Sequence, residues 1–293
     1  MWHFISDHIS DATGALFVCQ HRTKAPGGDS HNSFIIHDER RRFFVKVRPC
    51  EGEVTLIFEA DGLHAIAKTN TLHTPVVICH GTLDEGGKEY EYLVLSHIRF
   101  CTGTDQDWFT LGKQLAGMHN IDQGQQYGWH EDNRIGLSPQ RNVLHRSWPT
   151  FFSEFRIGAM LNRLAEKGER LTNNDVLVTA VNTLLYNHHP SPSLLHGDLW
   201  SGNAGFCKKG PVIFDPAVYI GDSETDIAMT ELFGGFNSEF YRGYASVRPL
   251  DDGYPERKQA YQLYHILNHA LLFGGHYQNM AKSVINDILK QSS

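Results

Sequence analysis

The sequence predicts an α+β fold of two lobes, in which a small antiparallel sheet with one main helix precedes a larger, mostly helical lobe. Short runs of β-branched and aromatic residues fill the first third of the chain, and apolar positions repeat at helical spacing through most of the rest. The 293 residues, 41% of them hydrophobic, are too many for one minimal core. We therefore predict a first lobe at 1–95, a second lobe at 96–293 and a hinge at about 94–98.

The first lobe is predicted to begin with an antiparallel meander whose strands are separated by the turn-rich segment KAPGGDSHN and the charged segment HDERRR. Apolar residues at helical spacing then predict a helix over 54–68. Two further strands, TPVVICHG and YEYLVLSHI, follow and are joined by a hairpin at DEGGK. The strands of the meander are predicted at 15–20, 33–37 and 43–47.

The second lobe is predicted to be mostly helical, with two short apolar stretches between the helices. These stretches, PSLLHGDLWSGNAGF and GPVIFDPAVYIGD, are too short for helices and end in polar residues. They are typical of β-strands that run into functional loops. The helices are predicted at 108–120, 149–167, 173–188, 224–233 and 257–290.

Composition excludes several classes of protein. The 26 Lys and Arg residues against 33 Asp and Glu residues give a formal net charge of −7, which argues against nucleic acid as a partner. We find no apolar run of membrane-spanning length and no secretory signal, so we expect a cytoplasmic protein that does not bind a membrane. Five scattered cysteines without a C-x-x-C pair predict neither disulfides nor a zinc site.

The strongest chemical signal is the segment LLHGDLWSGN. Asp198 and Asn203 in it have the spacing of a kinase catalytic loop, in which the acid accepts or orients the attacking hydroxyl and the amide binds a metal. Asp215 follows in VIFDPA at the end of an apolar strand, where kinases place their main Mg²⁺ ligand. Either acid alone could be a solvated loop residue, but the ordered spacing across two strand ends favours a catalytic pair with magnesium.

A possible nucleotide site lies upstream. Lys46 occurs within the strand FFVKV, and Glu59 lies in the helix that follows. Such a pair could contact the nucleotide phosphates, although a lysine pointing outward from an edge strand is the alternative. Gly27 and Gly28 would let backbone N–H groups approach phosphates, but two glycines in a hairpin are more often a simple turn.

Several segments together resemble the fructosamine kinase (ketosamine kinase) family, whose relatives are aminoglycoside and choline phosphotransferases of protein-kinase-like fold. The resemblance covers nearly the whole chain. HGDxxxxN is shared by the whole phosphotransferase group, whereas LWSGN, DPAVY and LFGG are more specific to fructosamine kinases. The segments that carry it are HGDLWSGN, DPAVYIGDSETDIAM, YGWHEDNRIG, SPQRN, WPTFFSEFRIG and YQLYHILNHALLFGG.

The resemblance implies a role for each residue of the motif. Asp198 is the catalytic base, Asn203 and Asp215 are metal ligands, and Lys46 with Glu59 forms the ion pair that positions the nucleotide. The adenine would be held by hinge backbone, which corresponds here to Ser96 and Ile98.

His196 and Asp226 correspond to residues that support the catalytic loop. Trp200, two residues after the presumed base, could form a wall against the acceptor, with packing within the second lobe as the alternative. Some family members are thought to be redox-switched through a cysteine just after the paired glycines. Here that position is Asp29, so no such switch is expected.

The sequence therefore predicts an ATP- and Mg²⁺-dependent kinase that phosphorylates a ketosamine hydroxyl, with O3 implied by the family, and so promotes deglycation. The acceptor could be a free or a protein-bound adduct, and a fructosamine or another ketosamine such as a ribulosamine. One rival is an aminoglycoside, choline or sugar kinase with the same catalytic residues. Another is a non-catalytic pseudokinase scaffold, which would be expected to have lost one of the catalytic residues, and none is lost. No oligomeric state is predicted.

Overall fold

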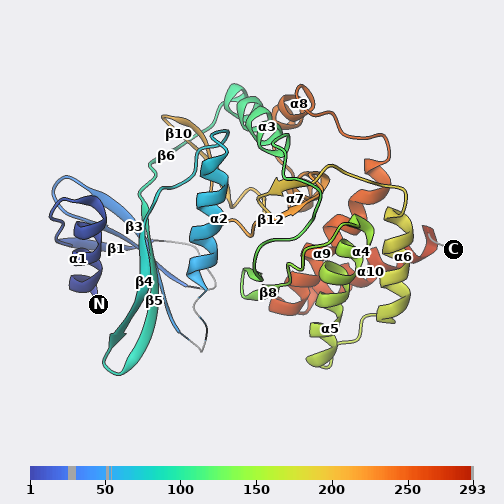
Figure 1. Cartoon of the computed structure of the whole chain (residues 1–293), viewed down its shortest axis with the longest axis horizontal. Coiled ribbons are helices and arrows are strands. Elements are labelled where there is room, and N and C mark those ends of the chain that lie inside the picture. Colours follow the sequence, from blue (N-terminus) through green and yellow to red (C-terminus); the bar gives the residue numbers. More distant parts are fainter. Residues whose placement is uncertain (26–30, 51–52, 54, 292–293) are drawn as a thin grey trace. The chain divides into compact units, whose positions relative to one another are not determined.

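The chain forms two compact units in a computed structural model (Figure 1). The first combines Met1–Gly103 with Gly205–Asp215, and the second combines Thr104–Ala204 with Pro216–Ser293. The first unit thus extends past residue 95, where the sequence placed the boundary, and takes in a segment from the middle of the chain. The structure describes residues 1–25, 31–50, 53 and 55–291.

The first unit opens with a helix that the sequence pattern did not predict, α1 (Trp2–Thr13). The strand predicted at 15–20 is wrong, because these residues follow the helix as an extended loop outside any sheet. Phe17 is buried while Leu16 and Val18 point into solvent, and the Phe17 amide donates to Ser10 Oγ of α1 at 2.9 Å. The alternation of buried and exposed residues resembles that of a strand, but the Phe17 amide bonds the preceding helix and not a neighbouring strand.

A five-stranded antiparallel sheet forms the centre of this unit, with the order β1-β2-β3-β5-β4. β4 and β5 form the predicted hairpin, and β3 pairs with β5 from Phe43 to Pro49. The strands are β1 (His21–Lys24), β2 (Asn32–His37), β3 (Arg42–Pro49), β4 (Val77–Glu85) and β5 (Lys88–Ser96).

Each face of the sheet is covered by a helix, as Figure 1 shows for α1 and for α2 (Leu56–Lys68). Side chains alternate between the faces along β5, so Tyr92 and Val94 pack in the core beneath α1, whereas Leu93 and Leu95 pack in the core beneath α2. Burial on both faces explains why β5 reads as a nearly continuous apolar run. Packing on the sheet therefore fixes the position of α2.

A smaller sheet explains why the middle segment belongs to the first unit. β6 (Phe100–Cys101) pairs with β10 (Ala204–Cys207), and β10 in turn pairs with β11 (Gly210–Ile213). His73 also forms a parallel bridge with Val212. The hairpin that leads to Asp215 is therefore bonded to the first unit.

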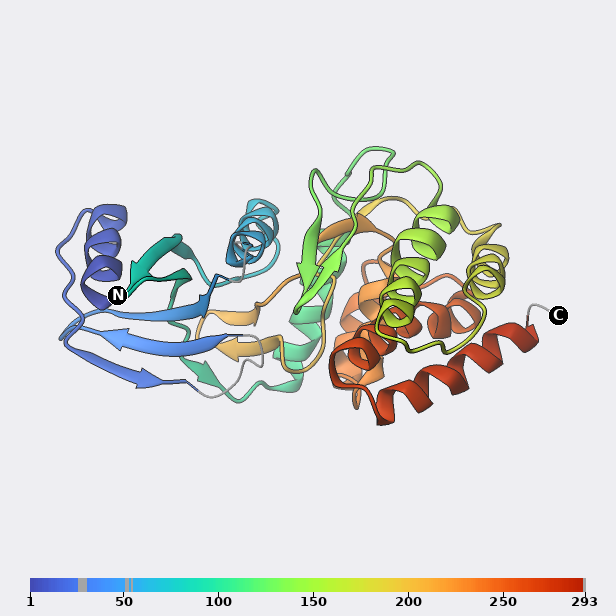
Figure 2. The ribbon, with the colours of Figure 1, turned by 90° about the horizontal axis from the view of Figure 1, so that it is seen from below.

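The second unit is built mainly from helices around α9 (Tyr254–Phe273), which is buried along much of its length. The single helix predicted over 257–290 is wrong, because the chain breaks at Gly274 and Gly275, both with positive φ, before α10 (His276–Gln291) (Figure 2). The other predicted helices are confirmed as α3 (Asp105–His119), α6 (Asn174–Leu185), α7 (Glu224–Leu232) and the continuous run α4 (Trp148–Phe152), η1 (Ser153–Gly158) and α5 (Ala159–Glu166).

Shorter elements complete this unit. The hairpin of β7 (Asn133–Ile135) and β8 (Ser138–Gln140) was not predicted, and neither was α8 (Ser238–Ala245), which packs against α3. β9 (Ser193–Leu195) and β12 (Tyr219–Gly221) form an antiparallel pair. Within the described residues, no helix has the length and apolar character needed to cross a membrane.

Helix α2 begins at a buried carboxylate from the sheet. Glu91 of β5 is fully buried, and its Oε2 accepts hydrogen bonds from the backbone amides of Thr55 at 2.6 Å and Leu56 at 2.7 Å. Its Oε1 accepts from the Thr55 hydroxyl at 2.9 Å and lies 3.3 Å from Arg48 Nε. A negative charge at the first turn also complements the helix dipole. Glu91 therefore fixes the start of the helix that carries Glu59.

Replacing Glu91 is expected to destabilise the protein. Glu91→Ala leaves two buried amides and the Arg48 guanidinium without this acceptor, so we expect the free energy of unfolding to fall by about 2 to 4 kcal/mol. Glu89, an exposed residue of the same strand, is the matched control, and Glu89→Ala should change it by less than about 0.5 kcal/mol. Urea denaturation checks both values. Equal effects of the two substitutions would contradict the anchoring role.

Candidate active site

Lys46, Glu59 and Asp215 meet in the first unit. The Lys46 ammonium on β3 is buried and donates to Glu59 Oε2 at 2.7 Å and to Asp215 Oδ1 at 2.6 Å. Glu59 lies one turn into α2, and Asp215 lies two residues beyond β11. One strand, one helix and one hairpin thus bring together three residues that are up to 169 positions apart in the chain.

These charges shift one another's ionisation. Burial alone would lower the pKa of Lys46, but Asp215 and Glu59 outweigh it and raise that pKa. Burial raises the pKa of Glu59 to about 7, aided by the Asp215 charge and opposed by Lys46. Burial also disfavours the ionised form of Asp215, yet the Lys46 ammonium holds the pKa of Asp215 below its usual range. Lys46 therefore stays charged, and Asp215 remains the ionised carboxylate.

Asp215 has an unusual backbone. Its φ is 56°, in the left-handed region that non-glycine residues rarely occupy. Its side chain is 39% exposed although Lys46 beneath it is buried. The carboxylate thus has one side toward Lys46 and an accessible side on which a cation could bind.

His31 is a neighbour of this cluster that the sequence reasoning missed. Burial and the Lys46 charge lower the pKa of His31 to about 4, with Asp215 opposing and Arg48 contributing to the decrease. His31 is therefore neutral near pH 7. A lone histidine after a glycine-containing segment of the sequence carries no signal that would have identified it.

The predicted catalytic loop follows β9 in the second unit. Asn203 Nδ2 donates to the Asp198 backbone oxygen at 2.9 Å and to Asp198 Oδ2 at 3.3 Å. The backbone N–H of Asn203 donates to the Trp200 carbonyl at 2.9 Å, which closes the loop. The Asn203 side-chain nitrogen is therefore committed to Asp198, and its side-chain oxygen is the atom suited to a metal.

Asp226 on α7 holds the start of this loop. It is buried, and its two carboxylate oxygens accept the backbone amides of His196 at 2.7 Å and Gly197 at 2.9 Å. Burial opposes its ionisation, but the hydrogen bond and charge of His119 outweigh that effect and lower the pKa of Asp226. His119 Nε2 lies 3.2 Å from Asp226 Oδ2, and His119 Nδ1 lies 2.8 Å from Tyr244 Oη.

Gly197 is required by the shape of the same turn. Its φ is 81°, and a Cβ added there would lie 2.0 Å from the Ala217 carbonyl oxygen. His196 is buried next to it, and its Nδ1 accepts the Asp198 amide at 3.3 Å. The glycine in HGD therefore allows the loop to turn against the segment between Asp215 and β12.

Trp200 lies at the edge of an aromatic group. Its ring is 39% exposed and packs edge-to-face with Phe233 at 6.4 Å between centroids. Phe233 contacts His269 at 4.9 Å, and His269 contacts Tyr277 at 5.0 Å. Sequence reasoning found only Trp200, because its partners are contributed by the end of α7, by α9 and by α10.

The predicted adenine and glycine contacts stay predictions. The Ser96 amide already donates to the Val76 carbonyl at 2.8 Å. Ile98 lies two residues beyond β5, outside helix and strand. Gly27 and Gly28, as well as Asp29, lie outside the described residues.

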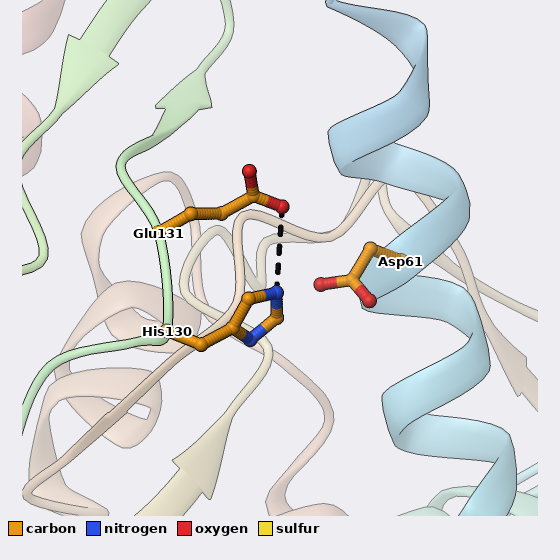
Figure 3. Close-up of side chains that lie close together, drawn as sticks. All are labelled: Asp61, His130 and Glu131. Atoms are coloured by element: carbon orange, nitrogen blue, oxygen red, sulfur yellow. Dashed lines mark ion pairs between the residues drawn. The ribbon is translucent and has the colours of Figure 1, made fainter.

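Two other clusters of charged side chains contain ion pairs that account for their charges. Figure 3 shows the ion pair of His130 and Glu131, 3.3 Å apart, with both side chains at least half exposed. An exposed pair of this kind contributes little to stability. His188, Asp222 and Glu224 also gather in the second unit, where the Arg257 guanidinium bonds Glu224 through two nitrogens at 2.8 and 2.7 Å. The charge of Glu224 is thus already balanced by an arginine.

Comparison with known proteins agrees with this geometry. A family model described as fructosamine kinase matches residues 1–291. A "Probable ketoamine kinase" of Vibrio parahaemolyticus is 43% identical, with 99% of both chains covered. A crystal structure named "Putative fructosamine-3-kinase", from Haemophilus somnus, has a TM-score of 0.92 at 34% identity and covers 99% of this chain and 98% of its own.

A more distant structure supports the fold alone. An aminoglycoside phosphotransferase in a ternary complex with AMP-PNP and hygromycin B has a TM-score of 0.64 at 14% identity, with 99% of both chains covered. The predicted kinase-like α+β fold is thereby confirmed.

Lys46 and Glu59 are expected to act as one unit in nucleotide binding. Because either loss breaks the same contact, the effects of Lys46→Met and Glu59→Gln on kcat/KM for ATP should be strongly non-additive. Lys46→Met should be the more severe single change, since it also removes the partner of Asp215. A double-mutant cycle measured by steady-state kinetics checks this.

The exposed ion pair of Arg242 and Glu239, 2.7 Å apart, provides the control. Replacing both of its members with alanine should leave kcat/KM unchanged. Additive effects at Lys46 and Glu59 would mean that the pair does not act as a unit.

Proposed function

The chain belongs to the fructosamine kinase family, and from that premise we propose that it transfers the γ-phosphoryl group of ATP to O3 of a ketosamine and so promotes deglycation. In this proposal the first unit binds the nucleotide, and the second carries the base and the acceptor surface. The observation that carries the proposal is Asp198, hydrogen-bonded to Asn203 in a loop anchored by Asp226. A half-buried carboxylate held in this way is suited to receive a proton from a hydroxyl.

These groups account for every bond and proton in the transfer step. The acceptor oxygen bonds to the γ-phosphorus while the bond from phosphorus to the ADP oxygen breaks, and the hydroxyl proton passes to Asp198. Lys46 would hold the nucleotide phosphates, since its ammonium is kept charged by Glu59 and Asp215. Membership of a kinase family supports ATP as the donor.

Asp215 and Asn203 each offer an oxygen atom that suits a magnesium ion. Asp215 offers an ionised, accessible carboxylate, and the Asn203 amide oxygen faces away from the nitrogen that binds Asp198. Hard oxygen ligands of this kind are those that Mg²⁺ prefers. Mg²⁺ bound there would neutralise charge on the phosphates during transfer.

Phosphorylation at O3 explains deglycation chemically. Loss of a C1 proton from the ketosamine gives an enaminol, and the C3 phosphate then leaves as inorganic phosphate. The resulting imine takes up water and releases the free amine with a 3-deoxy dicarbonyl compound. Free or protein-bound ketosamines would both react in this way, because the steps involve only C1 to C3.

Trp200 supports a sugar acceptor carrying an amine. Its exposed ring follows Asp198 by two residues and is backed by Phe233, so its free face is available to C–H groups of a sugar and to a protonated amine. An aminoglycoside, choline or other sugar kinase is the alternative, because it would use the same base and metal ligands.

A substrate panel tests the proposed acceptor. Synthetic ketosamines should turn over with ATP, whereas aminoglycosides and choline should not, and phosphorus NMR of the product should place the phosphate on O3. Asp198→Asn is the chemical control: turnover should fall about 10²-fold or more with ATP binding nearly intact, the scale expected for loss of a general base. A preference for choline or an aminoglycoside would select the alternative.

Trp200→Leu is expected to raise KM for the ketosamine about tenfold and to leave KM for ATP unchanged, because the ring is proposed to contact only the acceptor. Tyr186 is 68% exposed in the same unit, and Tyr186→Leu serves as the matched loss of an exposed ring. Steady-state kinetics on both variants checks this. A Trp200 variant that loses thermal stability and ATP binding together would instead indicate a packing residue.

A further inference from the structure

His265 is a buried histidine next to the catalytic loop whose function is not explained above. It lies on the buried helix α9, and its side chain is 4% exposed. In the described part of the chain, its Nδ1 is a buried atom without a hydrogen-bond partner. Buried polar atoms in native proteins are rarely left unpaired, so each such atom calls for an explanation.

The unpaired nitrogen is directed at the proposed base. His265 Nδ1 lies 3.9 Å from Asp198 Oδ1, and Asn203 Nδ2 lies 3.3 Å from the other oxygen, Oδ2. The first distance is too long for a hydrogen bond, but a movement of about 1 Å would form one. Catalytic hydrogen bonds are often long before substrate binds and tighten in the complex. His265 and Asn203 would then hold one carboxylate oxygen each.

The surroundings keep His265 neutral. Burial, the neighbouring His269 on α9 and Arg156 on η1 lower the pKa of His265 to about 3, while Asp226 on α7 opposes them. A neutral imidazole carries one N–H, so it can donate a hydrogen bond to a carboxylate without adding a charge. It also cannot replace Asp198 as a titrating group near pH 7.

Helix α9 holds His265 in place on both sides. The preceding Tyr264 is buried and donates its hydroxyl to Gln140 Oε1 at 2.7 Å. The His265 carbonyl lies 2.8 Å from His269 Nδ1, one turn further along. The backbone at His265 is therefore held by its helix before any substrate binds, which suits a positioning group.

We propose that His265 is a positioning residue that donates its Nδ1–H to Asp198 Oδ1 when the acceptor is bound. Together with Asn203, it sets the rotation of the carboxylate so that a remaining lone pair meets the acceptor hydroxyl. The proposal rests on the proposed function in that it takes Asp198 as the base.

Two substitutions separate this role from simple packing. His265→Phe keeps a ring but removes the donor, whereas His265→Asn places an amide nitrogen close to the position of Nδ1. We expect His265→Phe to lower kcat about tenfold with KM for ATP unchanged. The acidic limb of kcat against pH should move to higher pH, because a carboxylate that loses a donated hydrogen bond holds its proton more tightly.

His265→Asn should restore most of the rate and return the acidic limb toward its wild-type position. The exposed His189 provides the control, and His189→Phe should change neither quantity. An Asn variant no better than the Phe variant, with both folded, overturns the proposal. So does a Phe variant with wild-type kcat and an unmoved limb.

A tautomer measurement keeps the test independent of turnover. In protein labelled with ¹⁵N-histidine and saturated with AMP-PNP, magnesium and a synthetic ketosamine, the resonance missing from His265→Phe identifies His265. The proposal expects the Nδ1–H tautomer, and an Nε2–H tautomer overturns it. If the wild-type enzyme does not phosphorylate ketosamines, the proposed function fails, whereas an Nε2–H tautomer in a wild-type enzyme that does phosphorylate them overturns the role of His265 alone.

Discussion

The buried Asp226 carboxylate fixes the loop that carries Asp198, and the candidate site in the second unit depends on this anchor. A single buried side chain accepts two successive backbone amides, those of His196 and Gly197, and so determines where the chain turns after β9. The His119 and Tyr244 pair behind it connects the loop to α3 and α8. Because Asp226 binds backbone amides and not side chains, the path of the loop does not depend on the protonation state of Asp198.

The first unit contains a cluster of buried charged side chains. It buries one ammonium between two carboxyl groups, and because burial raises the pKa of Glu59 to about 7, Asp215 is the ionised partner that balances Lys46. In the proposed complex, a cation on Asp215 would compete with Lys46 for this carboxylate and leave the ammonium free to face a phosphate. The left-handed backbone at Asp215 thus lies within this charge cluster.

Sequence reasoning succeeded where chemistry is encoded locally. Asp198 and Asn203 are five residues apart, and Lys46 and Glu59 thirteen, so their strand, helix and loop positions could be read from adjacent patterns. It failed where partners are distant. Glu91 on β5 binds Thr55, which lies 36 residues earlier, and His265 on α9 lies beside Asp198 of a distant loop, so neither contact follows from a local pattern. The strand predicted at 15–20 failed because α1, with one narrow buried stripe at Ile5 and Ile9, was not recognised as a helix.

The interleaved course of the chain has a consequence for how such proteins can be recombined. The hairpin that ends at Asp215 belongs to the first unit, although about a hundred residues of the second unit separate it from Gly103 in the sequence. A single crossover between two homologous genes near that glycine would exchange Lys46 and Glu59 but leave Asp215 behind with the other parent. Lys46 and Glu59 would then come from one parent and Asp215 from the other. Inheriting it intact requires a double crossover, or parents whose hairpins already match.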